Sequence, residues 1–164
     1  MQTIGILGCG LMGSGIAQVC AQSGYRTVVR EVDQSLVDQG LGRIEKFLNE
    51  GVKRGKVSTE ERDKVMANLS GTTQMADFAE VDIVIEAIVE NLEAKQKMFA
   101  ALDGMVKDDT VFASNTSSLC ITEMASATKR PDRFLGLHFF SPVPVMKLVE
   151  VIRGLATSDE TYNR

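Results

Sequence analysis

The sequence has no tryptophan, one histidine and three prolines among its 164 residues, and aromatic residues make up only 5% of it. Its three cysteines lie far apart and form no C-x-x-C pair, so we expect free thiols, no metal site and a reducing cytoplasm. No apolar run approaches the length needed to cross a membrane. Met1 stands almost directly before the first apolar run, which leaves no room for a signal peptide. These absences predict a cytoplasmic protein with no membrane partner.

The charge balance is slightly acidic, with a formal net charge of −4 at pH 7. Proteins that bind nucleic acid usually carry a basic surface, so we expect no nucleic-acid partner. The sequence is 44% apolar and 24% charged, which is typical of a globular protein that buries a core. A chain of this length forms one domain, or one domain and part of a second.

The beginning of the sequence combines a short apolar run with closely spaced glycines. Ile4 to Leu7 predicts a buried strand, and Gly8, Gly10 and Gly13 follow in the spacing G-x-G-x-x-G. The first glycine permits a tight turn, the second lets a diphosphate approach the backbone, and the third lets the next helix, over residues 12–23, pack closely on the sheet. N–H groups at the start of that helix would face the anion. The candidate cofactor-binding residues of this turn are Gly8, Cys9, Gly10, Leu11, Met12 and Gly13.

An acidic residue follows the glycine turn at the distance expected for a dinucleotide site. Gly24 ends the predicted helix, an apolar run from Tyr25 to Val32 follows, and Glu31 stands eighteen residues after Gly13. An acid near this distance normally accepts hydrogen bonds from the hydroxyls of the adenosine ribose. The alternative is a glycine-rich turn that binds nothing, but the strand, the helix and the acid together favour the nucleotide site.

The remaining sequence alternates between helical and strand patterns. Periodicity and capping residues predict helices over residues 34–54, 58–69, 92–102 and 121–127. Apolar runs predict strands over residues 70–74, 81–87, 110–113, 134–140 and 147–152, followed by a polar tail over 157–164. Strands that alternate with helices indicate an α/β fold with a doubly wound, mostly parallel sheet and flanking helices.

Two groups of charged residues each allow two interpretations. Arg54 and Lys56, with Lys53, lie at the predicted end of a long helix, where cations either complement the helix dipole or bind the phosphates of a large anionic substrate. Spacing alone favours the dipole. Glu90 and Lys95 follow the 81–87 strand at the edge of the sheet where ligands bind, so they are either cofactor contacts or solvated surface charges. Spacing does not decide between these two.

Five short polar residues, Ser114 to Ser118, separate a predicted strand from a predicted helix. They either cap and turn into that helix or direct hydrogen-bonding groups into the ligand crevice, and both can hold because a cap uses only one or two of them.

His138 lies in a predicted strand between apolar neighbours, where a lone histidine is more often a core residue than a catalyst. Its strand ends on the same side of the sheet as the glycine turn, and Glu150 can return to it across a connection that Pro142 and Pro144 stiffen. A carboxylate beside an imidazole fixes its tautomer and prepares it to take a proton from an alcohol. Spacing alone does not establish the pairing, because the strand register is unknown.

Four motifs give the chain a family resemblance over essentially its whole length. They are GCGLMGSGIA at 8–17, EAIVEN at 86–91, SNTSS at 114–118 and HFFSPVPVM at 138–146. Together they resemble the N-terminal domain of the L-3-hydroxyacyl-CoA dehydrogenases, most closely the bacterial 3-hydroxybutyryl-CoA dehydrogenases. The resemblance implies a Rossmann fold, NAD as cofactor, and reversible oxidation of (S)-3-hydroxyacyl-CoA to 3-ketoacyl-CoA in fatty-acid or butanoate metabolism.

The resemblance implies roles for the residues around the substrate. His138 would be the general base that takes the proton of the substrate 3-hydroxyl, and Glu150 would orient and polarise it. Ser117 would hydrogen-bond the 3-oxygen, with Asn115 nearby, and both would also border the cofactor. In the reverse direction, protonated His138 would donate to the 3-keto group.

The resemblance also implies contacts with the two nucleotides. Glu31 would hold the adenosine ribose, while Glu90 and Lys95 would contact the nicotinamide side of the cofactor. Arg54 and Lys56 would bind phosphates of the coenzyme A part of the substrate.

The sequence departs from the family pattern in three respects. Glu31 stands where many relatives have aspartate, and Arg30 beside it would attract a 2′-phosphate, so the sequence leaves NADP open beside NAD. Ser141 replaces a frequent asparagine. Relatives continue for about another hundred residues as a helical domain that closes the cleft and makes a homodimer. That domain is absent from these 164 residues, of which 155–164 would begin the linker to it.

Other functions compete with this interpretation. The chain would be a nucleotide-binding fragment without turnover if closure by the helical domain is essential. A flavin protein often uses glutamate for its ribose, and some lens proteins of this family have a structural role, although retention of Ser117, His138 and Glu150 argues against the latter. A short-chain dehydrogenase needs Tyr-x-x-x-Lys, whereas Tyr25 is followed by Val29.

Overall fold

The computed structural model describes residues 3–164, so Met1, on which the signal-peptide argument rests, and Gln2 lie outside the described residues. The strands are β1 (Thr3–Leu7), β2 (Arg26–Arg30), β3 (Leu69–Thr72), β4 (Ile83–Glu86), β5 (Val111–Ser114), β6 (Phe134–Phe139) and β7 (Val149–Arg153). The α-helices are α1 (Leu11–Gln22), α2 (Gln34–Lys53), α3 (Thr59–Ala67), α4 (Leu92–Asp103), α5 (Ile121–Ala125) and α6 (Asp159–Asn163). Two short 3-10 helices, which the sequence patterns did not predict, cover Met75–Phe78 and Pro131–Arg133.

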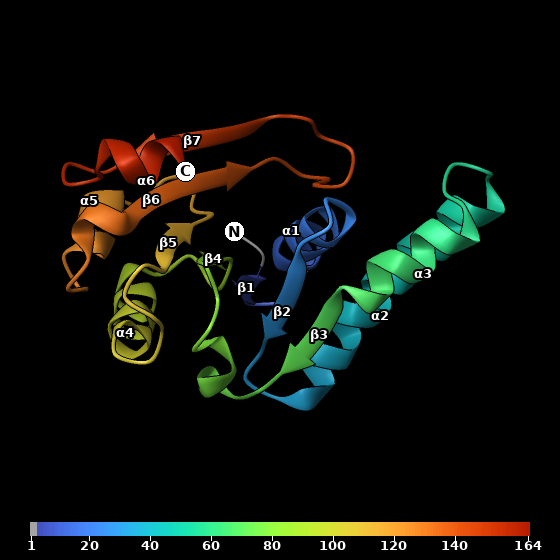
Figure 1. Cartoon of the computed structure of the whole chain (residues 1–164), viewed down its shortest axis with the longest axis horizontal. Helices are drawn as coiled ribbons and strands as arrows, with labels where there is room; N and C mark the ends of the chain where they lie inside the picture. The colour runs from blue at the N-terminus through green and yellow to red at the C-terminus, as the bar shows by residue number, and fades with distance from the viewer. Residues whose placement is uncertain (1–2) are drawn as a thin grey trace.

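The strands form one sheet in the order β3-β2-β1-β4-β5-β6-β7, visible in Figure 1. The first six strands of this order are parallel, and β7 pairs with β6 in the antiparallel direction. The prediction of a doubly wound, mostly parallel sheet is therefore confirmed. The strand order reverses between β1 and β4, and ligands of such sheets bind at this reversal, beyond the carboxyl ends of the strands.

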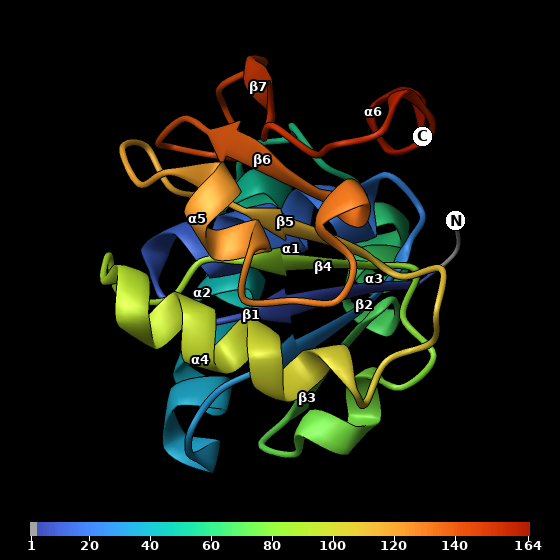
Figure 2. The ribbon, with the colours of Figure 1, turned by 90° about the vertical axis from the view of Figure 1, so that its left-hand side faces the viewer.

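Helices cover both faces of the sheet. Figure 2 shows α4 and α5 in front of it and α1, α2 and α3 behind it. The side of α1 and α2 has an aliphatic core that includes Ile6, Ile16 and Ile44, all at most 1% exposed. The side of α4 and α5 has an aromatic core, in which the ring centroids of Phe99 and Phe134 lie 4.6 Å apart. Because both faces are covered, the central strands β1, β4 and β5 are mostly apolar in sequence, whereas β2 and β3, toward one edge of the sheet, contain more polar residues.

The pair of helices α2 and α3 extends away from the sheet in Figure 1. Asp33 caps α2 by accepting a hydrogen bond from the backbone N–H of Leu36. Ser58 and Glu61 form the predicted capping box at the start of α3, each side chain bonding the backbone of the other residue. These caps fix where both helices begin, and the turn between them lies at the outer end of the pair.

The expectation that residues 157–164 form a polar tail is wrong. Helix α6 forms there, capped by the Ser158 hydroxyl, which accepts a hydrogen bond from the Thr161 backbone N–H. The Thr157 hydroxyl is buried and donates to the Phe134 carbonyl oxygen at 2.5 Å. This bond secures the segment against the beginning of β6. Composition indicated a polar stretch, but each of these polar groups has a specific partner in the fold.

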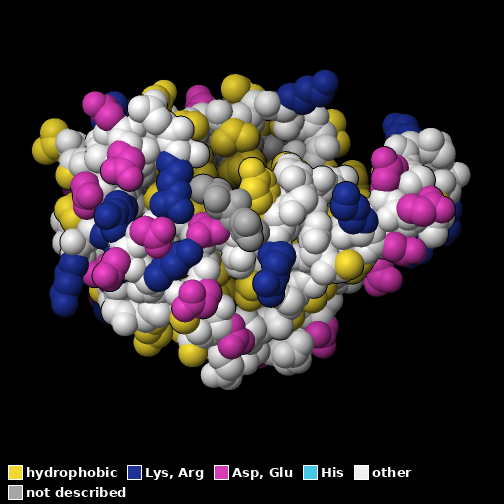
Figure 3. All heavy atoms as spheres, viewed as in Figure 1, with side chains coloured by type: hydrophobic (Ala, Val, Ile, Leu, Met, Phe, Trp, Pro, Cys, Tyr) yellow, Lys and Arg dark blue, Asp and Glu magenta, His cyan; other side chains and the backbone are white. Residues whose placement is uncertain are grey.

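The described surface shows charges of both signs. Figure 3 shows lysine, arginine, aspartate and glutamate side chains interspersed on one face of the molecule. No helix within residues 3–164 is long and apolar enough to cross a membrane. The same residues contain no group of three or more histidine, cysteine, aspartate or glutamate side chains placed to hold a metal ion.

Candidate active site

The glycine turn between β1 and α1 has the geometry of an anion site. Gly8 has φ +88°, and a Cβ at this position would lie 2.7 Å from the Ala87 carbonyl oxygen. A Cβ at Gly13 would lie 1.9 Å from the carbonyl oxygen of Gly8, so α1 and the turn are in direct contact there. A Cβ at Gly10 would meet nothing within 4 Å, which shows that this part of the turn borders open space. The turn therefore leaves room for a diphosphate to approach its backbone.

Helix α1 begins beside that open space without a cap. Its N-cap residue, Gly10, offers no side chain, and its first turn contains no acidic residue. The first N–H groups of a helix lack intrahelical partners and carry the positive end of the helix dipole. A diphosphate would accept hydrogen bonds from these N–H groups, and its negative charge would interact favourably with the helix dipole. The residues present therefore fit the phosphate part of a dinucleotide.

Glu31, directly after the neighbouring strand β2, is bonded to the glycine turn. Its Oε1 accepts a hydrogen bond from the Cys9 backbone N–H at 2.6 Å, and its Oε2 accepts one from Val32 at 3.2 Å. A carboxylate has about four acceptor sites, so lone pairs remain for ribose hydroxyls. The preceding Arg30 donates through Nε to the Thr73 carbonyl oxygen at 3.3 Å, a contact with the loop after β3.

Arg43 also contacts the turn, and the sequence analysis missed it. Its Nη1 donates to the Cys9 carbonyl oxygen at 3.1 Å from helix α2. Burial, followed by the charge of Glu31, raises the pKa of the Cys9 thiol to about 11, although Arg43 acts in the opposite direction. The thiol is therefore protonated and unreactive near neutral pH. Only the helical period of α2 could have suggested that Arg43 faces the turn.

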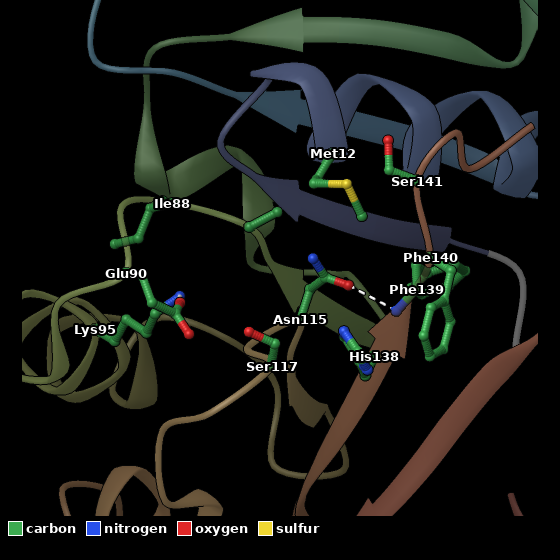
Figure 4. A pocket seen from close by; sticks show the side chains of 11 residues that line it. Met12, Ile88, Glu90, Lys95, Asn115, Ser117, His138, Phe139, Phe140 and Ser141 are labelled. Atoms are coloured by element: carbon green, nitrogen blue, oxygen red, sulfur yellow. Dashed lines mark hydrogen bonds and ion pairs between the residues drawn. The ribbon is translucent and has the colours of Figure 1, made fainter.

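A pocket of about 390 Å³ opens at the carboxyl ends of β4, β5 and β6, beside the start of α1. Its lining residues are Met12, Ala87, Ile88, Glu90, Lys95, Asn115, Ser117, His138, Phe139, Phe140 and Ser141. Figure 4 shows Glu90 and Lys95 on the left of this pocket, Met12 and Ser141 at the top, and Asn115, Ser117 and His138 below Met12 and Ser141 and to the right of Glu90. Six of the predicted site residues thus share one cavity: Met12, Glu90, Lys95, Asn115, Ser117 and His138.

His138 and Glu150 are cross-strand partners in the antiparallel pair of β6 and β7. His138 Nδ1 lies 2.7 Å from Glu150 Oε2. The side chain of His138 is 19% exposed and lines the pocket, so the interpretation as a core residue is wrong. If Nδ1–H donates to the carboxylate, the lone pair of Nε2 is available to a ligand. The register of β6 and β7 places the two residues opposite each other and so produces the His138–Glu150 contact, which spacing in the sequence could not establish.

The polar loop after β5 is tied to both neighbouring strands. Ser114 donates from Oγ to Oε2 of Glu86 at 2.6 Å. Asn115 Oδ1 accepts a hydrogen bond from the Phe139 backbone N–H at 2.8 Å, drawn as a dashed line in Figure 4. The second bond fixes the loop next to the strand that carries the histidine. It also leaves the amide N–H groups of Asn115 as donors.

The predicted cap on the following helix is wrong, whereas the predicted turn exists. Helix α5 begins after Cys120, which makes no side-chain capping bond. The Thr116 hydroxyl instead accepts hydrogen bonds from the backbone N–H groups of Ser118 at 3.3 Å and Leu119 at 2.9 Å. The loop thus turns before the helix starts, because a threonine hydroxyl can satisfy N–H groups two and three residues further on.

Lys95 is buried between two carboxylates, so the interpretation as a solvated surface charge is wrong for this residue. Its side chain is 1% exposed, and Nζ lies 2.5 Å from Glu86 Oε1 and 3.2 Å from Glu90 Oε2. Glu86 is fully buried and also accepts a hydrogen bond from the Ile88 backbone N–H at 2.7 Å. The sequence analysis gave Glu86 no role, although an acid that ends an apolar strand is a signal of a buried polar contact.

Glu90 is the partly exposed member of this group. Burial disfavours ionisation of its carboxyl, but hydrogen bonds from Thr116, Lys95 and the Ser117 backbone, with the charge of Lys95, outweigh it and lower the pKa. The carboxylate is therefore charged at neutral pH and forms part of the pocket wall.

Arg54 and Lys56 lie apart from the pocket. Arg54 is the C-cap residue of α2 and pairs with Glu50 one turn earlier at 3.9 Å, with both side chains exposed. Lys56 lies in the turn between α2 and α3, at the outer end of this helix pair, where it borders a separate hollow with residues of α1 and α3. The structure does not bring these two cations together with His138.

Comparison with known proteins agrees with this geometry. The family model described as the NAD binding domain of 3-hydroxyacyl-CoA dehydrogenase matches residues 3–164. A probable 3-hydroxybutyryl-CoA dehydrogenase of Deinococcus radiodurans is 50% identical over 157 residues, which cover 96% of this chain and 56% of that protein.

Two solved structures are similar over the whole chain. M. tuberculosis FadB2 has a TM-score of 0.97 and 47% identity, and the match covers 100% of this chain and 58% of that one. The (S)-3-hydroxybutyryl-CoA dehydrogenase PaaH1 of Ralstonia eutropha also has a TM-score of 0.97, with 44% identity over 99% of this chain and 58% of that one. The chain thus spans a little over half the length of these relatives. By sequence and by fold, it belongs to the 3-hydroxyacyl-CoA dehydrogenase family, as its NAD-binding domain.

Proposed function

We propose that this chain is the cofactor-binding and catalytic part of an NAD-dependent dehydrogenase that reversibly oxidises (S)-3-hydroxyacyl-CoA, with 3-hydroxybutyryl-CoA as a substrate. The observation that carries the proposal is the 2.7 Å contact between His138 and Glu150 at the pocket that also contains Ser117. A short acyl chain agrees with the names of the relatives, several of which are called 3-hydroxybutyryl-CoA dehydrogenases. Fatty-acid or butanoate metabolism in the cytoplasm is the setting that we propose for it.

In the proposed mechanism, His138 acts as the general base. Glu150 accepts the Nδ1 proton, so Nε2 takes the proton of the substrate 3-hydroxyl as the carbonyl forms. The charge of Glu150 stabilises the resulting imidazolium, and Ser117 donates a hydrogen bond to the 3-oxygen. In the reverse direction the same imidazolium returns the proton to the 3-keto oxygen.

NAD, when bound, supplies the acceptor for the hydride that leaves C3. The chain would hold its diphosphate on the N–H groups that start α1 and its adenosine ribose on Glu31. Lys95, Glu90 and Asn115 would hold the nicotinamide side. Lys95 is buried, so its ammonium is a fixed donor rather than a mobile surface cation.

The runner-up function is nucleotide binding without turnover by this chain alone. Its support is the apolar surface around the site: Val145 is 63% exposed and Leu148 54% exposed, close in sequence to Glu150. Apolar patches next to a site usually contact further protein. In the larger enzyme we propose that the part of the relatives beyond this chain covers the site and forms a homodimer.

The experiment that separates the two functions compares cofactor binding with turnover. Calorimetric titration with NADH and initial-rate NADH oxidation with acetoacetyl-CoA are measured for the wild type and for His138→Gln. An enzyme loses turnover and keeps cofactor binding in the variant. A wild type that binds no NADH would contradict both functions.

A further inference from the structure

The loop that carries Ser117 is bonded to the side of the pocket where the cofactor is proposed to bind. The Thr116 hydroxyl donates a hydrogen bond to Oε1 of Glu90, and Oε2 of Glu90 lies 3.2 Å from Lys95 Nζ. Figure 4 shows Glu90 and Lys95 on one side of the pocket and Ser117 beside His138 on the other. The Ser118 hydroxyl, 3.5 Å from the same Oε1, and the Ser117 backbone also contact the Glu90 carboxylate. Thr116 is the buried side chain among these contacts, and it joins the two sides.

The Thr116 hydroxyl has its hydrogen and its lone pairs all engaged. The hydrogen goes to Glu90, and the lone pairs accept the backbone N–H groups of Ser118 at 3.3 Å and Leu119 at 2.9 Å. The residue is 3% exposed, so water cannot easily replace any of these partners. A movement of the Glu90 carboxylate must therefore either move the backbone of Ser118 and Leu119 or break the hydrogen bond between Thr116 and Glu90.

The other end of the same loop is also fixed. Ser114 is bonded to the buried Glu86, and Asn115 is bonded to the backbone next to His138. Only the stretch from Thr116 onward depends on Glu90, a side chain that is 44% exposed at the pocket wall. That stretch contains the serine that would contact the substrate oxygen.

We propose that Thr116 is a positioning residue that couples cofactor binding at Glu90 and Lys95 to the placement of Ser117. A ligand that restricts the Glu90 carboxylate also restricts the Thr116 hydroxyl, and through it the N–H groups of Ser118 and Leu119. The cofactor therefore prepares the site for the substrate before the substrate arrives. This inference rests on the proposed function, because it takes Glu90 and Lys95 as cofactor contacts.

Two substitutions of Thr116 separate positioning from packing. Thr116→Val keeps the shape of the side chain and removes the hydroxyl, whereas Thr116→Ser keeps the hydroxyl and removes the methyl group. Thr110→Val is the matched control. Thr110 is 0% exposed and donates its hydroxyl to the Val81 carbonyl oxygen at 2.7 Å, before the start of β5 and away from the pocket.

The test is amide hydrogen exchange of residues 114–120, measured with and without NADH, together with the NADH affinity of the same preparation. In the wild type, Thr116→Ser and Thr110→Val, NADH slows exchange at Ser118 and Leu119. In Thr116→Val, NADH still binds but the slowing is lost, and exchange at these two amides is faster even without ligand.

Two results would overturn the coupling while leaving the proposed function in place. One is NADH-dependent slowing in Thr116→Val equal to that of the wild type. The other is NADH binding to the wild type with no slowing in this loop. Failure of the wild type to bind NADH would instead contradict the proposed function, and the coupling with it.

Discussion

His138 and Glu150 face each other across the only antiparallel strand pair in the described sheet, with Nδ1 of the imidazole 2.7 Å from the carboxylate. The backbone register places them opposite each other, so the contact does not depend on a flexible loop. Glu150 is 51% exposed at its side chain, and solvent therefore reaches the pair from one side. Closure by further protein would strengthen the interaction by excluding that water.

Replacing Glu150 by glutamine tests this pair. The amide oxygen can still accept the Nδ1 proton, so the orientation of His138 is kept, but the charge that stabilises the imidazolium is lost. We expect turnover to fall by roughly 10²–10⁴-fold with little change in NADH affinity. The measurement is the initial rate of NADH oxidation with acetoacetyl-CoA. Glu160→Gln, in helix α6, is the control for loss of a carboxylate elsewhere. Equal rates for wild type and Glu150→Gln would remove Glu150 from the mechanism.

The chain alone is expected to bind cofactor and turn over substrate poorly. A fusion to the part of the Deinococcus radiodurans relative that the 56% match leaves uncovered should raise turnover. Exclusion of water and tighter orientation of the reactants would increase the rate by about 10²-fold or more. Rates for the chain and the fusion are compared at the same NADH occupancy. If the chain alone turned over substrate as fast as the fusion, these 164 residues would be sufficient for full activity.

The cofactor preference follows from the fixed position of Glu31. Its carboxylate is bonded to the Cys9 backbone N–H, while Arg30 is bonded to the carbonyl of Thr73. A 2′-phosphate would meet the negative charge of Glu31 without a free cation from Arg30. We expect NAD to bind at least about tenfold more tightly than NADP, and Glu31→Ser to narrow this difference. Parallel calorimetric titrations with NAD and NADP measure the two affinities in the wild type and in Glu31→Ser. Tighter binding of NADP to the wild type would show that Arg30 turns toward the ligand.

The local motifs were predictable because neighbouring residues in the sequence produce them. The G-x-G-x-x-G turn and the capping box at Ser58 are arranged by contiguous backbone, so their geometry follows from their spacing. Glu31 contacts the turn from a neighbouring strand, but it was predictable because the strand–helix–strand unit places an acid at a regular distance from the glycines. The pairing of His138 with Glu150 depends on strand register, which the sequence does not specify.

Partners on other elements of the fold explain what the sequence analysis missed. Glu86 acquires its role from Ser114 on β5 and Lys95 on α4, and Thr116 acquires its role from Glu90. Each of these bonds joins residues between nine and 28 positions apart. Helix α6 was missed for a similar reason, since a buried hydrogen bond from Thr157 to β6 secures a segment that looks polar and short.

The lowered pKa of Glu90 predicts how the stability depends on pH. Because the pKa of this carboxyl in the folded protein is below its usual value of 4.5, the carboxylate stabilises the fold above that pH and loses this effect as pH falls through the folded pKa. The difference in unfolding free energy between wild type and Glu90→Gln should therefore shrink below about pH 4.5. Urea titrations from about pH 3 to pH 7 measure it. If the difference in unfolding free energy between the two proteins did not change with pH over this range, the contacts of ionised Glu90 with Thr116 and Lys95 would not stabilise the fold.

Gly13 tests the steric argument for the glycine turn, since a methyl group there would lie 1.9 Å from the Gly8 carbonyl oxygen. Gly13→Ala must push α1 away from the turn, and we expect a loss of about 3 kcal/mol in unfolding free energy together with loss of NADH binding. Gly42→Ala is the matched control in α2, because a methyl group there would meet nothing within 4 Å. It should instead stabilise the protein by about 0.5–1 kcal/mol through the higher helix propensity of alanine. If Gly13→Ala were as stable as the control and still bound NADH, the contact between α1 and the turn would not be needed to shape the anion site.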